Sequence, residues 1–117
     1  MTICGYLGPK GTYSEFAINQ FNNMNGTFYE CRPYSSFFNL FEALEQETCE
    51  KIFVPVENSI GGPVSSVLDL MVSYPSVFIE KECFFPISCH LFTKSGVSLD
   101  NITDIISHPQ PIFMAVI

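Results

Sequence analysis

Three short polar segments of the chain carry the residue types best suited to bind a small charged molecule. Each combines amides, hydroxyls, a carboxylate or an imidazole with glycine or proline. Asn, Gln, Ser and Thr donate hydrogen bonds to carboxylates, and glycine lets the backbone approach a ligand closely. The three segments read GPKGTYS (8–14), ENSIGGP (57–63) and SHPQ (107–110).

The elements expected around these segments would bring them to one edge of a sheet. Each segment follows a run that predicts a strand, at residues 2–7, 51–56 and 102–107, and precedes a pattern typical of a helix. Ligands of open α/β sheets bind at the carboxyl ends of the strands, where helix N-termini favour anions. The sequence therefore predicts a site for an anionic small molecule, with Lys10 rather than Arg32 as the cation that steers it.

Each segment also has an ordinary structural interpretation. Thr12 stands three residues before Glu15, which is the arrangement of a capping box, and a capping residue can still contact a ligand. Asn58 and Ser59 can hydrogen-bond their own turn. His108 precedes a proline and can be a surface residue without a function. Three such loops, all placed after strands, favour the binding interpretation.

The order of the elements predicts the fold class. A further strand is expected at residues 27–31, and a further helix begins after Ser35 or Ser36, so the chain reads βαβαβα. This alternation predicts an α/β fold with a parallel sheet and right-handed crossovers. Pro55 indicates an edge strand or the end of a strand, and Pro63 suits the first turn of a helix. The expected buried helix faces are Tyr13, Phe16, Ala17, Phe21 and Met24; Phe37, Leu40, Phe41 and Leu44; and Val64, Val67, Leu68 and Met71.

A different pattern begins near residue 75. Residues 77–93 alternate over a long strand-like run that Pro86 interrupts, and no helical pattern occurs inside it. A long crossing strand between two α/β units suggests a second lobe. We therefore expect a first α/β lobe at residues 1–75, followed at residues 76–117 by a crossover and an incomplete second lobe.

Composition narrows the function classes. The chain has 117 residues, is 47% hydrophobic and carries a net charge of −7 with only five Lys plus Arg, which disfavours nucleic acid and anionic membranes as partners. Five cysteines without a C-x-x-C pair predict buried, reduced thiols rather than disulfides or a zinc site. No signal peptide or membrane-spanning run is recognisable, so we expect a cytoplasmic protein without a bound metal.

The three polar segments, taken with their flanks, resemble a known family. YLGPKGTYSE (6–15), VPVENSIGGPVSSVLDLM (54–71) and SHPQ (107–110) resemble the leading motifs of the prephenate dehydratase domain, in the same order and spacing. The resemblance implies a two-lobed α/β fold similar to the type II periplasmic binding proteins, with the substrate between the lobes. It also implies conversion of prephenate to phenylpyruvate in phenylalanine biosynthesis, without a cofactor.

The resemblance also assigns roles to individual residues. It implies that Asn58, Ser59 and Gln110 are catalytic. The Thr-Arg-Phe motif of the family, whose threonine is credited with a central role, lies beyond residue 117, and the regulatory ACT domain is absent too. We therefore expect an incomplete catalytic domain that is inactive alone and forms a homo-oligomer. The residues expected to contact prephenate are Thr12, Lys10, Glu57, Ser107 and His108.

Two other classes of function stay open at this stage. The first is a non-catalytic, sensor-like domain of the same fold that binds a carboxylate, and the second is a structural or interaction fragment. Loss of a carboxylate-orienting residue would impair turnover in an enzyme but only affinity in a sensor. The sequence also leaves open whether arogenate is accepted in place of prephenate.

Overall fold

The body of the protein is a mixed α/β unit built on a small parallel sheet, seen in a computed structural model that describes residues 1–58, 62–86 and 90–106. The three strands are β1 (Ile3–Leu7), β2 (Glu30–Tyr34) and β3 (Lys51–Phe53). Both neighbours of β1 run parallel to it, in the order β2-β1-β3. The predicted parallel sheet is therefore confirmed.

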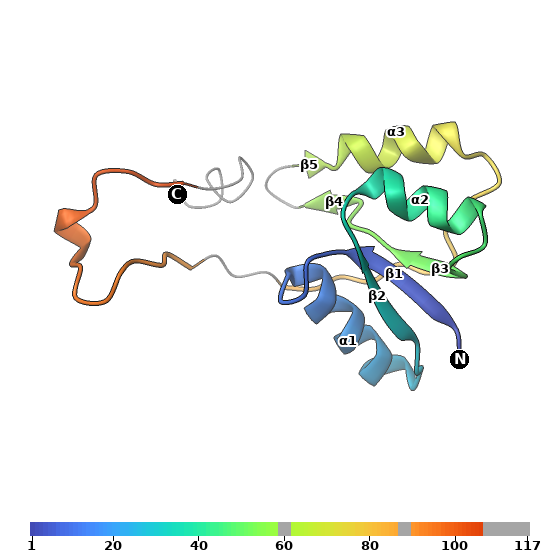
Figure 1. Cartoon of the computed structure of the whole chain (residues 1–117), viewed down its shortest axis with the longest axis horizontal. Helices are drawn as coiled ribbons and strands as arrows, with labels where there is room; N and C mark the ends of the chain where they lie inside the picture. Colours follow the sequence, from blue (N-terminus) through green and yellow to red (C-terminus); the bar gives the residue numbers. More distant parts are fainter. Residues whose placement is uncertain (59–61, 87–89, 107–117) are drawn as a thin grey trace.

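Two of the three helices cover the two faces of this sheet, and the third packs against one of them. The three helices are α1 (Tyr13–Asn25), α2 (Phe37–Glu45) and α3 (Ser65–Ser73). Because β2 and β3 lie on opposite sides of β1, right-handed crossovers place α1 on one face and α2 on the other. Figure 1 shows this arrangement, with α3 packed beside α2.

The core gathers around β1, which is the central strand. Cys4 and Tyr6 on β1 are buried, and each helix contributes at least one fully buried side chain. The expected apolar faces of α2 and α3 are confirmed at their centres, although Leu68 is partly exposed. The remaining buried side chains are Ile18 and Phe21 on α1, Leu40, Phe41 and Ala43 on α2, Cys49, and Val67 on α3.

The expected face of α1 is wrong in part. Tyr13, Phe16 and Met24 are at least half exposed, whereas Ile18 and Phe21 are buried. The apolar residues of this helix extend over a wider arc than one contact line, and a three-stranded sheet offers only a narrow surface to pack against. Tertiary contact therefore selects one part of the apolar arc, and the helical spacing alone could not identify it.

Strand boundaries differ from the sequence expectation at three places. The second strand starts at Glu30 instead of residue 27, and β3 ends at Phe53, two residues before Pro55. Residues 57–58 and 62–63 pair as two short antiparallel strands, β4 (Glu57–Asn58) and β5 (Gly62–Pro63). Pro63 thus belongs to β5, and α3 begins only at Ser65, because the pairing with β4 holds Pro63 in an extended conformation.

The long strand expected at residues 77–93 is absent from the described residues of that range. Residues 77–86 instead pass along β3 without strand pairing. Glu80 forms an ion pair with Lys51, and the ring centroid of Phe85 lies 6.2 Å from that of Phe53. Alternation of apolar residues indicates which side chains share a face of a strand, but it does not show that a neighbouring strand is available. It therefore predicted a strand at a place where the backbone has no strand to pair with.

Residues 90–106 extend away from the α/β body (Figure 1). They include the short 3-10 helix η1 (Leu99–Asn101), and the strand expected at 102–107 is not formed over residues 102–106. Almost all of this segment is exposed. Among the helices of the described part, none has the length and apolar character to cross a membrane.

Candidate functional site

The first polar loop follows β1 and is fixed to the neighbouring strand at its start. The Gly8 N–H donates to the carbonyl of Tyr34 over 2.8 Å. A Cβ added at Gly8 would lie 2.9 Å from Cβ of Pro33, so the loop passes β2 too closely for any side chain. Lys10 is exposed, and Gly11 has a φ of +88°, a conformation that favours glycine. The loop therefore presents Lys10 at a turn that only these glycines allow.

Thr12 ends the loop and caps α1, as one of the two interpretations predicted. Its Oγ1 accepts a hydrogen bond from the Glu15 N–H over 3.5 Å and donates to the Leu7 carbonyl over 3.3 Å. The reciprocal half of the expected capping box is different. Glu15 Oε1 accepts from the Gly11 N–H over 2.9 Å instead of from Thr12, because the left-handed turn at Gly11 aims that N–H at the helix.

Glu15 also binds the buried side chain of Tyr6 in β1, below the loop. Its Oε2 accepts a hydrogen bond from the Tyr6 hydroxyl over 2.9 Å, and Tyr6 is 1% exposed. Burial, followed by the hydrogen bond to Glu15, raises the pKa of Tyr6 to about 12. The Gly11 N–H, followed by the Tyr6 hydroxyl, lowers the pKa of Glu15. The loop is thus held by an ionised carboxylate and a neutral phenol.

The second polar segment follows β3, and its two described ends pair with each other. Its hairpin is closed by the Val64 N–H, which donates to the Val56 carbonyl over 2.8 Å, and by the pairing of Asn58 with Gly62. Glu57 is exposed and Asn58 is partly buried. Ser59, expected to act beside them, lies outside the described residues.

The structure brings the first two loops to one end of the sheet. Tyr6 and Phe53 are paired in register on adjacent parallel strands, so the chain leaves β1 and β3 at the same edge (Figure 1). The loops that carry Lys10 and Thr12, and Glu57 and Asn58, therefore start from the same edge of the sheet. The third loop, with Ser107, His108 and Gln110, lies outside the described residues.

The helix that follows the second loop is fastened to α2 at its far end. The Tyr74 hydroxyl donates to the Glu42 carboxylate, and the Ser76 hydroxyl donates to Glu45 over 3.1 Å. The Tyr74 ring also packs on Phe41, with centroids 5.6 Å apart. The hydrogen bond to Glu42 and burial raise the pKa of Tyr74 to about 12. These contacts pack the C-terminal end of α3 against α2, away from the two loops.

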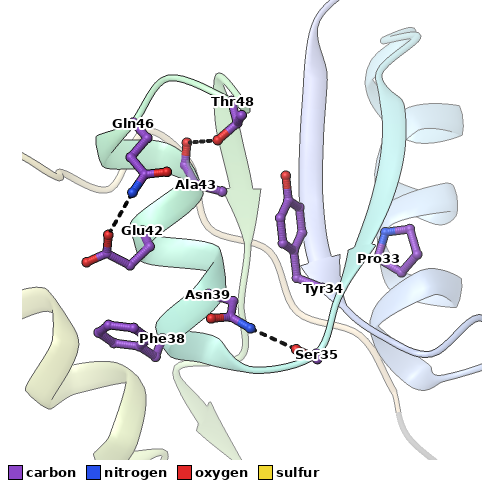
Figure 2. Close-up of a pocket in the computed structure, with 9 residues that line it drawn as sticks. All are labelled: Pro33, Tyr34, Ser35, Phe38, Asn39, Glu42, Ala43, Gln46 and Thr48. Atoms are coloured by element: carbon purple, nitrogen blue, oxygen red, sulfur yellow. Dashed lines mark hydrogen bonds between the residues drawn. The ribbon is translucent and has the colours of Figure 1, made fainter.

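A shallow hollow lies elsewhere, between the end of β2 and α2 (Figure 2). Its polar groups largely satisfy one another: Asn39 donates to the Ser35 hydroxyl over 2.7 Å, and Gln46 donates to Glu42 over 3.2 Å. None of the residues expected at the site lines it. It is a poor candidate for carboxylate recognition, because it holds Glu42 and no cation. Its lining consists of Pro33, Tyr34, Ser35, Phe38, Asn39, Glu42, Ala43, Gln46 and Thr48.

The described residues offer neutral donors and one exposed cation at the sheet edge. Arg32 and Lys51 are paired with Glu30 and Glu80, away from the first loop. No group of three or more His, Cys, Asp or Glu side chains that could hold a metal occurs within residues 1–58, 62–86 and 90–106. Such a site can bind and orient an anion through hydrogen bonds and Lys10.

Sequence reasoning missed Tyr6 and gave Glu15 only a capping role. The signal for Tyr6 was its position in the middle of a buried strand, because a buried tyrosine hydroxyl normally requires a partner. The first acidic residue of the following helix was the available acceptor. The expected buried thiols are confirmed for Cys4 and Cys49, which are free, while Cys31 and Cys83 are free and partly exposed.

Comparison with known proteins gives one consistent answer. A profile of the prephenate dehydratase family matches residues 4–114. The bifunctional chorismate mutase/prephenate dehydratase of Buchnera aphidicola (from Acyrthosiphon pisum) is 32% identical over 108 residues, covering 91% of this chain and 27% of the relative. The Escherichia coli K12 protein of the same name is 30% identical, with 91% and 27% covered. The arogenate dehydratase/prephenate dehydratase 2 of Arabidopsis thaliana is 30% identical, with 90% and 26% covered.

The match is extensive for this chain and partial for its relatives. The chain spans only about a quarter of the length of the curated relatives it matches. No solved structure matches significantly. Because the family profile covers nearly all of the residues, including both loops at the sheet edge, the chain belongs to the prephenate dehydratase family.

Proposed function

We propose that this chain carries part of the substrate site of a prephenate dehydratase, and that its full-length gene product converts prephenate to phenylpyruvate. The observation that carries the proposal is the placement of two family motifs at the adjacent carboxyl ends of β1 and β3. The family match over residues 4–114 supports it independently.

The reaction requires the groups that these loops offer. Prephenate carries two carboxylates and a ring hydroxyl. The bond to the ring carboxylate breaks and releases carbon dioxide, its electron pair makes the ring aromatic, and the hydroxyl departs as water after taking up a proton. The site must therefore hold the pyruvyl carboxylate and supply a proton to the hydroxyl, which is a poor leaving group as hydroxide.

Each loop has a role in this proposal. Lys10 and Thr12, at the N-terminus of α1, bind a carboxylate, where the helix end adds a partial positive charge. Asn58 and Ser59 orient the reacting ring, and Glu57 stands beside them at the rim. In a two-lobed fold similar to the type II periplasmic binding proteins, the second lobe closes the site with Gln110, Ser107 and His108.

The proposal includes self-association. Several large apolar side chains of the later segment are almost fully exposed, among them Phe84, Phe92 and Ile106. Exposed apolar surface of this kind favours contact with another polypeptide. A sizing measurement that finds a monomer at micromolar concentration would rule out the homo-oligomer.

A turnover experiment tests the proposed function. The full-length gene product is incubated separately with prephenate and with arogenate, and carbon dioxide and the aromatic product are quantified. We expect one carbon dioxide per phenylpyruvate formed from prephenate. Turnover of arogenate alone would reassign the substrate, and tight binding of prephenate without turnover would favour the carboxylate sensor.

A further inference from the structure

One carboxylate connects the central strand, the first loop and α1. Glu15 uses one oxygen for the Tyr6 hydroxyl of β1 and the other for the Gly11 N–H of the loop, each over 2.9 Å. Its own N–H is held by the capping hydroxyl of Thr12. Both oxygens of Glu15 are thus occupied by the protein itself, so Glu15 acts through its partners rather than by touching a ligand.

The two ends of the loop are anchored differently. The start is held by backbone, through the Gly8 N–H and the Tyr34 carbonyl. The end is held by side chains, with Glu15 accepting from the Gly11 N–H and the Thr12 hydroxyl donating to the Leu7 carbonyl. Lys10 lies between these two anchors. Removal of Glu15 therefore releases the Gly11 turn beside Lys10, while the start of the loop and Thr12 stay in place.

The floor of the loop is rigid because Tyr6 is fully packed. Tyr6 is 1% exposed and lies in register with Phe53 of β3, the strand that leads to the second loop. A loop tied to Tyr6 is consequently tied to the same sheet that positions Asn58. The charged and titratable groups that act on this cluster are Lys10 and Cys31.

We infer that Glu15 is a positioning residue for substrate binding, because it clamps the loop of residues 8–12 to the buried hydroxyl of Tyr6. This inference rests on the proposed function, in which that loop binds a carboxylate of prephenate. Loop contacts with a carboxylate persist from the bound substrate to the transition state, so weakening them raises KM more than it lowers kcat.

Kinetics on the full-length gene product separate positioning from a merely structural role. We expect Glu15→Ala to raise KM for prephenate by roughly tenfold and to leave kcat within about threefold of the original. In Glu15→Gln, KM should stay close to the value of the original protein. The amide oxygen can accept a hydrogen bond from the Gly11 N–H, and the NH2 group can donate one to the Tyr6 hydroxyl. Glu42→Ala is the matched control, since it breaks a similar bond between the Glu42 carboxylate on α2 and the Tyr74 hydroxyl at the end of α3, and KM should stay unchanged.

An NMR measurement reports the clamp even if prephenate is not the substrate. The amide proton of Gly11 should shift as the pH is lowered through the pKa of Glu15, and this titration should vanish in Glu15→Gln. If Glu15→Ala fails to fold, Tyr6→Phe, which removes only one of the two bonds, takes its place in the kinetic comparison. The inference is overturned if Gly11 shows no such titration, or if Glu15→Ala and Glu42→Ala change KM equally. Absence of turnover in the original protein would overturn the proposed function alone. The Gly11 titration would then still show whether Glu15 holds the loop.

Discussion

Replacing Gly8 by alanine should damage the first loop more than any other single methyl group added there. The new Cβ would lie 2.9 Å from Cβ of Pro33 and 3.4 Å from the Tyr34 carbonyl oxygen. Carbons in ordinary contact are about 3.5 to 4.0 Å apart, so the loop and β2 must separate by roughly 0.6 Å or more. Neither atom can rotate away, because one belongs to a proline ring and the other is bonded directly to the backbone.

The expected loss follows from two contributions. Overpacking of this kind costs about 1–3 kcal/mol, and stretching the 2.8 Å bond from the Gly8 N–H to Tyr34 forfeits about 1 kcal/mol more. We therefore expect Gly8→Ala to lower the free energy of unfolding by about 2–4 kcal/mol. The measurement is urea denaturation followed by circular dichroism, extrapolated linearly to water.

A second glycine of the same loop provides the control. Nothing lies within 4 Å of a Cβ added at Gly11, so Gly11→Ala meets only the strain of its positive φ, about 1–2 kcal/mol. Gly11→Asn should lose less, because asparagine tolerates this conformation. A Gly8→Ala protein as stable as the original, within about 0.5 kcal/mol, would refute the close approach of loop and strand.

Three further predictions concern the site, its pH dependence and the core. Asn58→Ala should lower kcat/KM of the full-length gene product roughly 10²-fold, about 2.7 kcal/mol, with little change in melting temperature, and unchanged kcat/KM would exclude Asn58 from the mechanism. Because the pKa of Glu15 is lowered on folding, its stabilisation is complete above the unfolded pKa of about 4.3 and is lost as the pH falls through the folded pKa. In Glu15→Gln, the free energy of unfolding, measured by urea titration, should therefore fall less steeply as the pH is lowered. An unchanged dependence on pH would contradict the contact between Glu15 and Gly11. Phe41→Ala should cost about 3–5 kcal/mol, whereas Phe38→Ala, at a side chain that is 55% exposed, should cost well under half of that in the same assay.

Local sequence signals predicted the order of the main strands and helices up to α3 and the caps of the first two helices. The helix caps at Thr12 and Ser36 lie where the pattern placed them. These signals are short-range, because a cap is a side chain bonded to a backbone three residues away. Parallel pairing followed from the alternation of strands and helices, which is also a property of neighbouring segments.

The errors arose where a long-range partner decides the outcome. Residues 77–86 alternate like a strand but contact β3 only through side chains, such as Glu80 with Lys51 and Phe85 with Phe53. At Pro63 a local preference for helix starts yielded to pairing with Glu57. A single sequence carries no information on which edge is available to pair with, so these features could not be predicted from it.

The candidate site was predictable in its position and not in its internal bonds. Loops after β1 and β3 were placed at one edge correctly, because the strands are parallel neighbours. The hydrogen bonds from Tyr6 and Gly11 to Glu15 depend on the burial of the Tyr6 side chain and on the positive φ of Gly11. Neither quantity can be read from residue types and spacing. The roles of Ser59, Ser107, His108 and Gln110 remain predictions from the family motifs.

The central claim is that prephenate binds at the carboxyl ends of β1 and β3. Hydrogen–deuterium exchange with mass spectrometry, on the full-length gene product with and without prephenate, tests it most directly. We expect protection of peptides covering residues 8–15 and 54–64, and no change over α2. Protection confined to residues 35–48, which line most of the hollow of Figure 2, would contradict the account and move the site to the hollow between β2 and α2.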